Sequence, residues 1–134
     1  MKANWSNHNL ALLLLRLCVA TILIIHGVAG MFNGGLTGFG QYLNGVGFGY
    51  FGLPLAWMIK LSHVVAAITL LLARWQFWPG LLTVFILVTG IFLVHLPSGW
   101  FVVGGGFNGV EFNLLLIVAL LVMIFPKNEL KIRL

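Results

Sequence analysis

Four long apolar stretches, at residues 10–31, 54–73, 79–95 and 110–125, limit the folds that are open to this chain. The hydrocarbon core of a membrane is about 30 Å thick, and a helix of roughly 20 apolar residues crosses it. In lipid the backbone must satisfy its own hydrogen bonds, so only helices and closed β-barrels span a membrane. The apolar residues here come in runs instead of alternating with polar ones, which favours helices. The sequence therefore predicts an all-α membrane protein, an antiparallel bundle of four transmembrane helices in one domain over residues 1–134.

The composition excludes a water-soluble monomer. Hydrophobic residues make up 61% of the chain and charged residues 7%, whereas soluble domains average about 45–50% and about 25%. The net charge is +5, but the basic residues are separated by apolar stretches and do not form the patch that nucleic-acid binding requires. We therefore expect the lipid bilayer, and no nucleic acid, as a partner. The single cysteine, Cys18, provides neither an intrachain disulfide nor a redox-active pair.

The positions of the basic residues predict the orientation in the membrane. The two long connections, 32–53 and 96–109, are rich in glycine and contain neither Lys nor Arg. Outside the apolar stretches, the basic residues are Lys2, Arg74, Lys127, Lys131 and Arg133. Since basic residues stay on the cytoplasmic side, both termini and the connection at Arg74 are predicted to be cytoplasmic, and the glycine-rich connections to face outward. The aromatic residues of 32–53 indicate a short interfacial helix or lid on the bundle.

Ionisable side chains within the spans are the main candidates for function, because such groups are costly in lipid and tend to face the bundle interior or a functional path. At 1.5 Å per residue, His26 lies about 8 Å before the outer end of the first helix and His63 about 13 Å below that of the second. The residues predicted to line a ligand-binding pocket in the outer half are Arg16, His26, Lys60, His63, His95 and Glu111. Lys60 and His63 are three residues apart and share a helix face, and we expect Glu111 to pair with Lys60 or a histidine.

Each of these residues also has a purely structural interpretation. His26 and His95, near helix ends, suit interfacial hydrogen bonding, and a carboxylate at the start of a helix, as at Glu111, complements the helix dipole. Arg16 and Lys60 have side chains long enough to snorkel to the membrane surface. The remaining residue, His63, is the deepest titratable group in the outer half, where neither snorkelling nor interfacial water explains it well. We therefore predict that function depends most on His63.

In their order and spacing, several short motifs resemble the DoxX family of small four-helix membrane proteins. The resemblance extends from Leu14 to Pro126, and its elements are Leu15-Arg16-Leu17, His26-Gly27, Phe51-Gly52-Leu53-Pro54, Arg74, His95-Leu96-Pro97-Ser98-Gly99-Trp100-Phe101 and Gly109-Val110-Glu111-Phe112. Where a member of this family is expected to carry Glu midway through the second helix, this chain has His63, which favours a site based on imidazole. The resemblance implies a multi-pass protein of the bacterial cytoplasmic (inner) membrane that associates with redox systems, as a DoxX-type subunit does with a thiosulfate:quinone oxidoreductase.

Three functions remain open on the sequence alone. The first is a subunit of a membrane redox system, rather than a stand-alone enzyme, whose pocket binds a quinone head group or a small sulfur species through its histidines. The second is a metal or haem site with His26, His63, His95 and Glu111 as candidate ligands, although no local metal motif such as H-E-x-x-H is present. The third is a structural or assembly subunit without chemistry. Other redox subunits, or a second copy of the chain, are the expected protein partners.

Overall fold

The computed structural model of the chain describes residues 5–104 and 106–125, and within them all regular structure is helical. The α-helices are α1 (Trp5–Val28), α2 (Gly35–Leu43), α3 (Gly52–Leu71), α4 (Phe77–Gly90) and α5 (Val110–Ile124). Short π- and 3-10-helical turns join α2 to α3 (η1, Asn44–Phe48; η2, Gly49–Phe51) and extend α4 (η3, Ile91–His95; η4, Leu96–Ser98). Of the basic residues used to predict the orientation, Lys2, Lys127, Lys131 and Arg133 lie outside the described residues.

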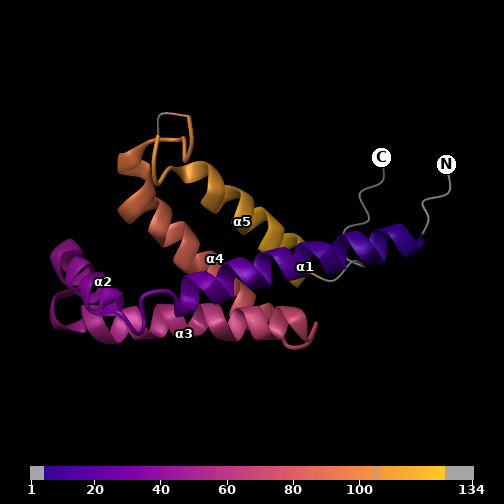
Figure 1. The fold of residues 1–134 in the computed structure, drawn as a ribbon, viewed down its shortest axis with the longest axis horizontal. Helices are drawn as coiled ribbons and strands as arrows, with labels where there is room; N and C mark the ends of the chain where they lie inside the picture. Colours follow the sequence, from indigo (N-terminus) through magenta and orange to yellow (C-terminus); the bar gives the residue numbers. More distant parts are fainter. Residues whose placement is uncertain (1–4, 105, 126–134) are drawn as a thin grey trace.

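The four long helices form two pairs that diverge toward one end of the molecule. Helix α1 packs along α3, α4 packs against α5, and α3 also contacts α4. In Figure 1 the two pairs separate toward the end where α2 lies, which we call the α2 end of the bundle. Where the pairs meet, apolar side chains fill the core, among them Leu23, Ala67, Leu70, Leu87 and Leu120. The divergence of the pairs leaves space between them at the α2 end.

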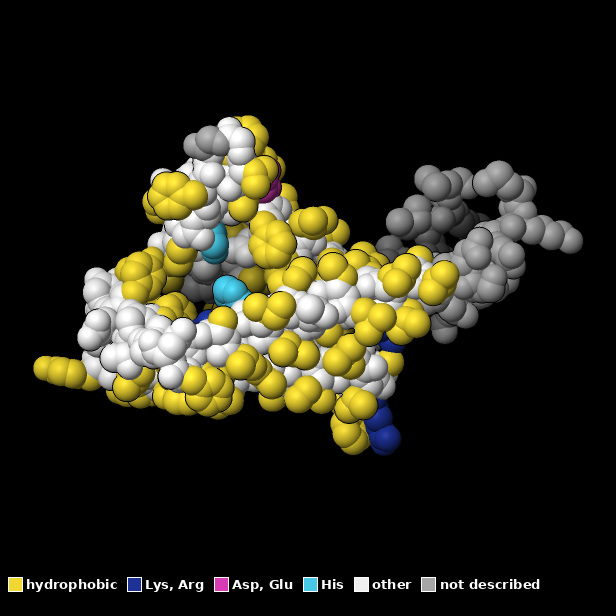
Figure 2. Space-filling model, viewed as in Figure 1, with side chains coloured by type: hydrophobic (Ala, Val, Ile, Leu, Met, Phe, Trp, Pro, Cys, Tyr) yellow, Lys and Arg dark blue, Asp and Glu magenta, His cyan; other side chains and the backbone are white. Residues whose placement is uncertain are grey.

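The lengths of the helices confirm a fold built for a membrane. Leu10–Val28, Gly35–Leu71 and Phe77–Ser98 are long and apolar enough to cross one. The fourth predicted span, α5, is also apolar, but its 15 residues reach only about 22 Å, less than a hydrocarbon core of about 30 Å. Large apolar side chains are exposed on all four long helices and cover the face seen in Figure 2. A surface of this kind is typical of contact with lipid or with another protein.

Helix α2 confirms the short helix predicted in the first glycine-rich connection. It folds back on α3, where Leu36 and Leu43 are buried together with Ala56. Gly40 makes this close crossing possible, because a Cβ atom there would lie only 2.9 Å from the Cα atom of Leu53. Helix α2 is therefore packed against α3 instead of lying free on the surface of the bundle.

The third span departs from the single helix predicted over residues 79–95. Its α-helical part ends at Gly90, and the chain continues as the π-turn η3 and the 3-10 turn η4. Pro97 lies four residues after Leu93 and has no N–H, so the α-helical hydrogen bond to the Leu93 carbonyl cannot form. Wider π-helical turns are frequent at functional sites, and this one carries His95.

Candidate functional site

A cavity of about 560 Å³ opens at the α2 end, between the diverging helix pairs. In Figure 2 it shows as a hollow with histidine side chains, drawn in cyan, at its edge. Small-molecule sites have volumes of about 300–1,000 Å³ and are mostly apolar with a few polar groups. The wall of this cavity is largely aromatic and aliphatic and includes Phe39, Phe48, Leu55, Phe85, Leu87 and Leu93. In size and character it therefore resembles a site for a small apolar molecule.

Four of the six residues predicted for the pocket line this cavity. His26 comes from the last turns of α1, Lys60 and His63 from α3, and His95 from η3. The shared helix face predicted for Lys60 and His63 is confirmed, since both side chains reach the same cavity. His63 is the most buried of the four, with 1% of its surface exposed. Three separate helical segments thus bring titratable groups to one space.

Close packing of α1 on α3 brings two of the histidines together. The imidazole rings of His26 and His63 meet edge to face, with their centroids 5.4 Å apart. Gly27 allows this approach, because a Cβ atom there would lie 2.8 Å from Cγ2 of Val64 and 3.0 Å from the carbonyl oxygen of Lys60. The pair of rings therefore depends on the missing side chain at Gly27.

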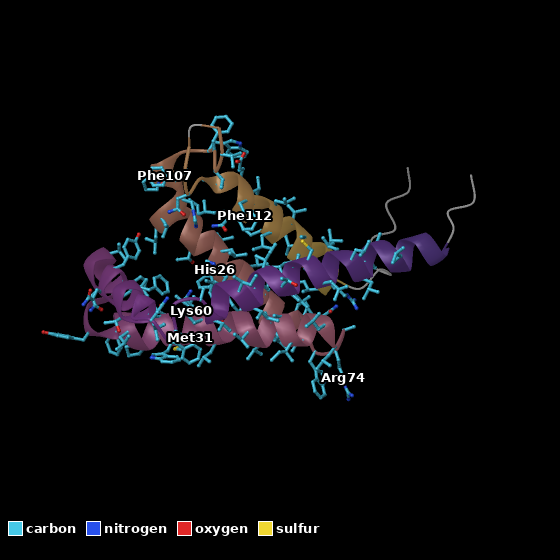
Figure 3. The ribbon with its side chains drawn as sticks, in the orientation of Figure 1. His26, Met31, Lys60, Arg74, Phe107 and Phe112 are labelled. Carbon is cyan, nitrogen blue, oxygen red and sulfur yellow. The ribbon has the colours of Figure 1, made fainter. Side chains whose placement is uncertain are left out.

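Lys60 binds the end of α1. Its Nζ donates a hydrogen bond of 2.6 Å to the carbonyl oxygen of His26 and lies 5.9 Å from the ring centroid of Phe39. His26 belongs to the last turn of α1, where backbone carbonyls have no partner within the helix. Figure 3 shows Lys60 and His26 near each other beside the opening between the helix pairs, and Arg74 at the opposite end of α3. The ammonium group of Lys60 is thus engaged within the cavity wall.

Two histidines hold their Nδ1 atoms against backbone carbonyls. His63 Nδ1 lies 2.6 Å from the oxygen of Ile59, one turn earlier in α3, and His95 Nδ1 lies 2.7 Å from the oxygen of Asn108. Asn108 has a φ of 60°, a left-handed conformation that Asn adopts more readily than most residues. Both rings are therefore fixed in orientation. The Nε2 atom of His63 is buried, and no partner for it occurs in the described part of the chain.

Tyr42 joins α2 to the opposite wall of the cavity. Its hydroxyl donates a hydrogen bond of 2.9 Å to the carbonyl oxygen of Leu93 in η3. This is the carbonyl that Pro97 leaves without an α-helical partner. Because Tyr42 and Leu93 both line the cavity, the bond closes α2 over the space between the helix pairs.

Glu111 does not line the cavity, and its predicted ion pair is wrong. The carboxylate accepts a hydrogen bond of 2.8 Å from the backbone N–H of Val102, and the backbone N–H of Glu111 donates to the carbonyl of Trp100. Within the described residues, no ion pair joins Glu111 to Lys60 or to a histidine. As the acidic residue in the first turn of α5, Glu111 fits the helix-dipole interpretation and holds the preceding connection against the helix.

Arg16 also lies away from the cavity, and the described part of the chain forms no group of three side chains that could hold a metal ion. Arg16 precedes His26 by ten residues in α1, which corresponds to about 15 Å along the helix axis. Over residues 5–104 and 106–125, no three His, Cys, Asp or Glu side chains are placed to hold a metal ion. The set of His26, His63, His95 and Glu111, considered above as metal or haem ligands, is therefore not assembled.

Three polar residues of the cavity, Asn113, Tyr42 and Thr89, were not among the predicted site residues, and the hydroxyl of Thr89 on α4 donates to the carbonyl of Phe85 in its own helix. Asn113, buried in α5, contributes an amide to the lining, and Tyr42 contributes a hydroxyl from α2. In the sequence, Asn113 stands out as an amide within an otherwise apolar run. Because an amide does not ionise, it was not among the ionisable side chains from which the site was predicted. Tyr42 was predicted only as part of a lid.

Comparison with known proteins gives one result. The family model described as DoxX matches residues 11–96. This range contains every described residue of the cavity wall except Asn113. No match was found among curated proteins or among solved structures.

Proposed function

Because this chain belongs to the DoxX family of membrane proteins, we propose that it is a subunit of a membrane redox system whose cavity binds the head group of a quinone. The observation that carries the proposal is the convergence of three histidines and one lysine on a cavity that is otherwise apolar. The ammonium group of Lys60 and the ring N–H of His26 can donate to a quinone carbonyl, and imidazole nitrogens that carry a lone pair can accept from the hydroxyl groups of its reduced form. The aromatic and aliphatic walls suit the ring and its apolar chain.

The lining favours a quinone over a small sulfur species as the ligand. A sulfur oxyanion is strongly hydrated, so a protein site binds it only where several cationic or N–H groups replace the water molecules around it. Among the described lining residues, Lys60 is the one permanent cation, and it already binds the carbonyl of His26. A quinone ring carries no net charge and exposes apolar surface, so an apolar cavity stabilises it.

The position of Phe85 supports entry of the ligand from the lipid. Phe85 lines the cavity and also a shallow apolar depression on the outside of α4, together with Trp78, Leu82 and Val88. Its side chain is 67% exposed, and exposed side chains change rotamer on the picosecond to nanosecond scale. A quinone dissolved in the bilayer therefore has a path to the histidines that does not pass through water.

The cavity is proposed to lie toward the outer side of the bacterial inner membrane, with both chain termini in the cytoplasm. Arg74 supports this orientation, because it follows α3 at the end remote from Lys60 and His26 (Figure 3). Basic residues in short connections mark the cytoplasmic side. A site in the outer half fits a quinone-dependent reaction with a partner subunit on that side.

A photoreactive azido-quinone tests the proposed site. The full chain is reconstituted in nanodiscs, irradiated with the probe, and digested for mapping of the labelled peptides. We expect labelling at cavity residues such as Phe39 or Leu93, and competition by unlabelled decyl-ubiquinone. Lys60→Met should sharply weaken the labelling, because it removes the ammonium donor that a quinone carbonyl needs. It should leave the bundle assembled, because a lost side-chain hydrogen bond in a membrane protein averages only about 0.6 kcal/mol.

Thr69→Val is the matched control. Thr69 lies on α3 outside the cavity wall, and its hydroxyl bonds the carbonyl of Ala66 within the same helix. This variant should label like the wild type. Labelling confined to Trp78 and Leu82 on the outer face of α4, or equal labelling of the Lys60→Met variant, would refute the site. If that variant also supports the full activity of its complex, the structural-subunit function takes its place.

A further inference from the structure

The tautomer of His63 follows from its hydrogen bond. Its Nδ1 atom lies 2.6 Å from the carbonyl oxygen of Ile59. A carbonyl oxygen can only accept, so Nδ1 carries the proton and donates it. Burial of an unpaired charge is costly, so the neutral imidazole is the form that this buried position accommodates. In the neutral ring the other nitrogen, Nε2, then bears a lone pair and accepts hydrogen bonds.

That lone pair is a buried, unsatisfied group in the cavity wall. The Nε2 atom of His63 is buried and has no hydrogen-bond partner among the described residues, while the residue lines the cavity. Buried polar atoms in native proteins nearly always have a partner, so an unpartnered one requires an explanation. Since Nδ1 is turned to the backbone of its own helix, Nε2 is the nitrogen left for a molecule in the cavity.

His95 repeats the arrangement on the opposite wall. Its Nδ1 lies 2.7 Å from the carbonyl oxygen of Asn108, which again places a proton on Nδ1 and, in the neutral ring, the lone pair on Nε2. Gly90 lies beside this atom and has no side chain to cover it, since a Cβ atom there would come within 4.0 Å of His95 Nε2. Two histidines from different helical segments thus present acceptors to the same cavity.

Several donors of the cavity wall are already engaged. The hydroxyl of Tyr42 donates to the carbonyl of Leu93, the hydroxyl of Thr89 donates to its own helix, and Nζ of Lys60 donates to the carbonyl of His26. Further N–H bonds remain only on Lys60, the amide of Asn113 and the ring of His26. His63 and His95, whose Nδ1 protons are held by carbonyl oxygens, present only hydrogen-bond acceptors to the cavity.

From this arrangement we propose that the cavity binds the quinol, the hydroxyl-bearing reduced form, more tightly than the quinone, an inference that rests on the function proposed above. A quinol presents an O–H donor at each end of its ring, whereas a quinone carbonyl can only accept. A quinone carbonyl placed at His63 sets one lone pair against another and leaves both unpaired. Lys60 or Asn113 can still bind the other end of a quinone, so the quinone binds, but with one bond fewer.

The test compares decyl-ubiquinol with decyl-ubiquinone under anaerobic conditions. The full chain is held in nanodiscs of phosphatidylethanolamine and phosphatidylglycerol, and the Kd of each form is measured. One added hydrogen bond, without an unpaired lone pair, corresponds to about tenfold tighter binding of the quinol. The same preference raises the midpoint potential of the bound couple by about 30 mV, the value for a tenfold ratio in a two-electron couple.

Two variants locate the effect. His63→Gln should lower the ratio of the quinone Kd to the quinol Kd, because the amide can turn either its N–H or its carbonyl to the ligand. His95→Gln changes a different helical segment and should also lower the ratio of the quinone Kd to the quinol Kd. It therefore keeps the test possible if the His63 variant does not fold. Thr69→Val should keep the wild-type ratio.

The outcomes separate this inference from the function on which it rests. If neither form binds the wild type, the quinone site itself fails. If both bind and the quinone binds as tightly as the quinol or more tightly, the preference is refuted while the quinone site stands. An unchanged ratio in both glutamine variants would show that the histidine acceptors do not cause the preference, and would overturn the inference.

Discussion

Replacement of Gly27 by Ala tests the contact that brings the histidine-bearing helices together. Gly27 is buried where α1 crosses α3, one residue after His26. A Cβ atom at this position would lie 2.8 Å from Cγ2 of Val64, 3.0 Å from the carbonyl oxygen of Lys60 and 3.4 Å from Cβ of His63. Because the second of these contacts is with backbone, the helices themselves must move apart.

The expected loss of stability follows from those distances. The contact with Val64 has to lengthen by about 0.7 Å to reach the ordinary carbon–carbon separation of about 3.5 Å. Overpacking of this kind costs about 1–3 kcal/mol, while alanine is favoured over glycine in a helix interior by about 1 kcal/mol. The Gly27→Ala variant should therefore lose up to about 2 kcal/mol of unfolding free energy and bind the quinone more weakly.

A second glycine separates the two contributions. Gly38 lies on α2, and a Cβ atom there would meet nothing within 4 Å, so Gly38→Ala should carry only the favourable helix term. The free energies of unfolding are measured by titration with SDS in mixed micelles, followed by helicity. Adding Val64→Ala to Gly27→Ala should restore part of the loss, since the contact with the Lys60 carbonyl remains. If Gly27→Ala is as stable as Gly38→Ala, the close contact is not limiting and the reasoning fails.

Three further predictions address other parts of the fold. Tyr42→Phe removes the hydrogen bond to the Leu93 carbonyl and should raise the rate of amide hydrogen exchange in α2 about threefold, the factor that corresponds to a lost hydrogen bond of roughly 0.6 kcal/mol. Unchanged exchange in α2 would show that this hydrogen bond does not hold the helix. Glu111→Gln should keep the wild-type free energy of unfolding because an amide oxygen still accepts from the N–H of Val102, whereas Glu111→Ala should lose about 1 kcal/mol. Equal unfolding free energies for the two variants in SDS would show that the hydrogen bond to Val102 does not stabilise the fold. Gly38→Cys in a Cys18→Ala background should react with a membrane-impermeant maleimide from the outer side only, and reaction from the cytoplasmic side alone would reverse the predicted orientation.

The helices of this protein are predictable because lipid leaves the backbone little choice. Apolar runs of sufficient length must form helices when no water is present to bind backbone groups, and this requirement locates α1, α3, α4 and α5. The depth of a residue along each helix follows from the rise per residue. Depth alone was enough to place His26, Lys60, His63 and His95 at the same end of the bundle, where they line one cavity.

The direction in which a side chain points about its helix was not predictable in the same way. In soluble proteins an apolar stripe marks the buried face, but α5 is apolar on nearly every side, so its sequence does not show which face is buried. Glu111 was placed at the correct depth and still turns to Val102. Asn113, two residues later and therefore about 200° around the axis, is the residue that reaches the cavity.

The polar side chains of the bundle share a task that explains which of them remain free for a ligand. Lys60 binds a carbonyl in the last turn of α1, Gln76 donates a bond of 2.6 Å to the carbonyl of Met123 in the last turn of α5, and Tyr42 binds the carbonyl that Pro97 leaves unpaired. Carbonyls near the end of a helix or before a proline have few backbone partners within the helix, which is costly in a membrane unless a side chain supplies a donor. These side-chain donors therefore bond backbone carbonyls near helix ends. Histidine differs, because a neutral ring that donates at Nδ1 still accepts at Nε2, so a bundle that uses its donors in this way keeps acceptors for whatever enters its cavity.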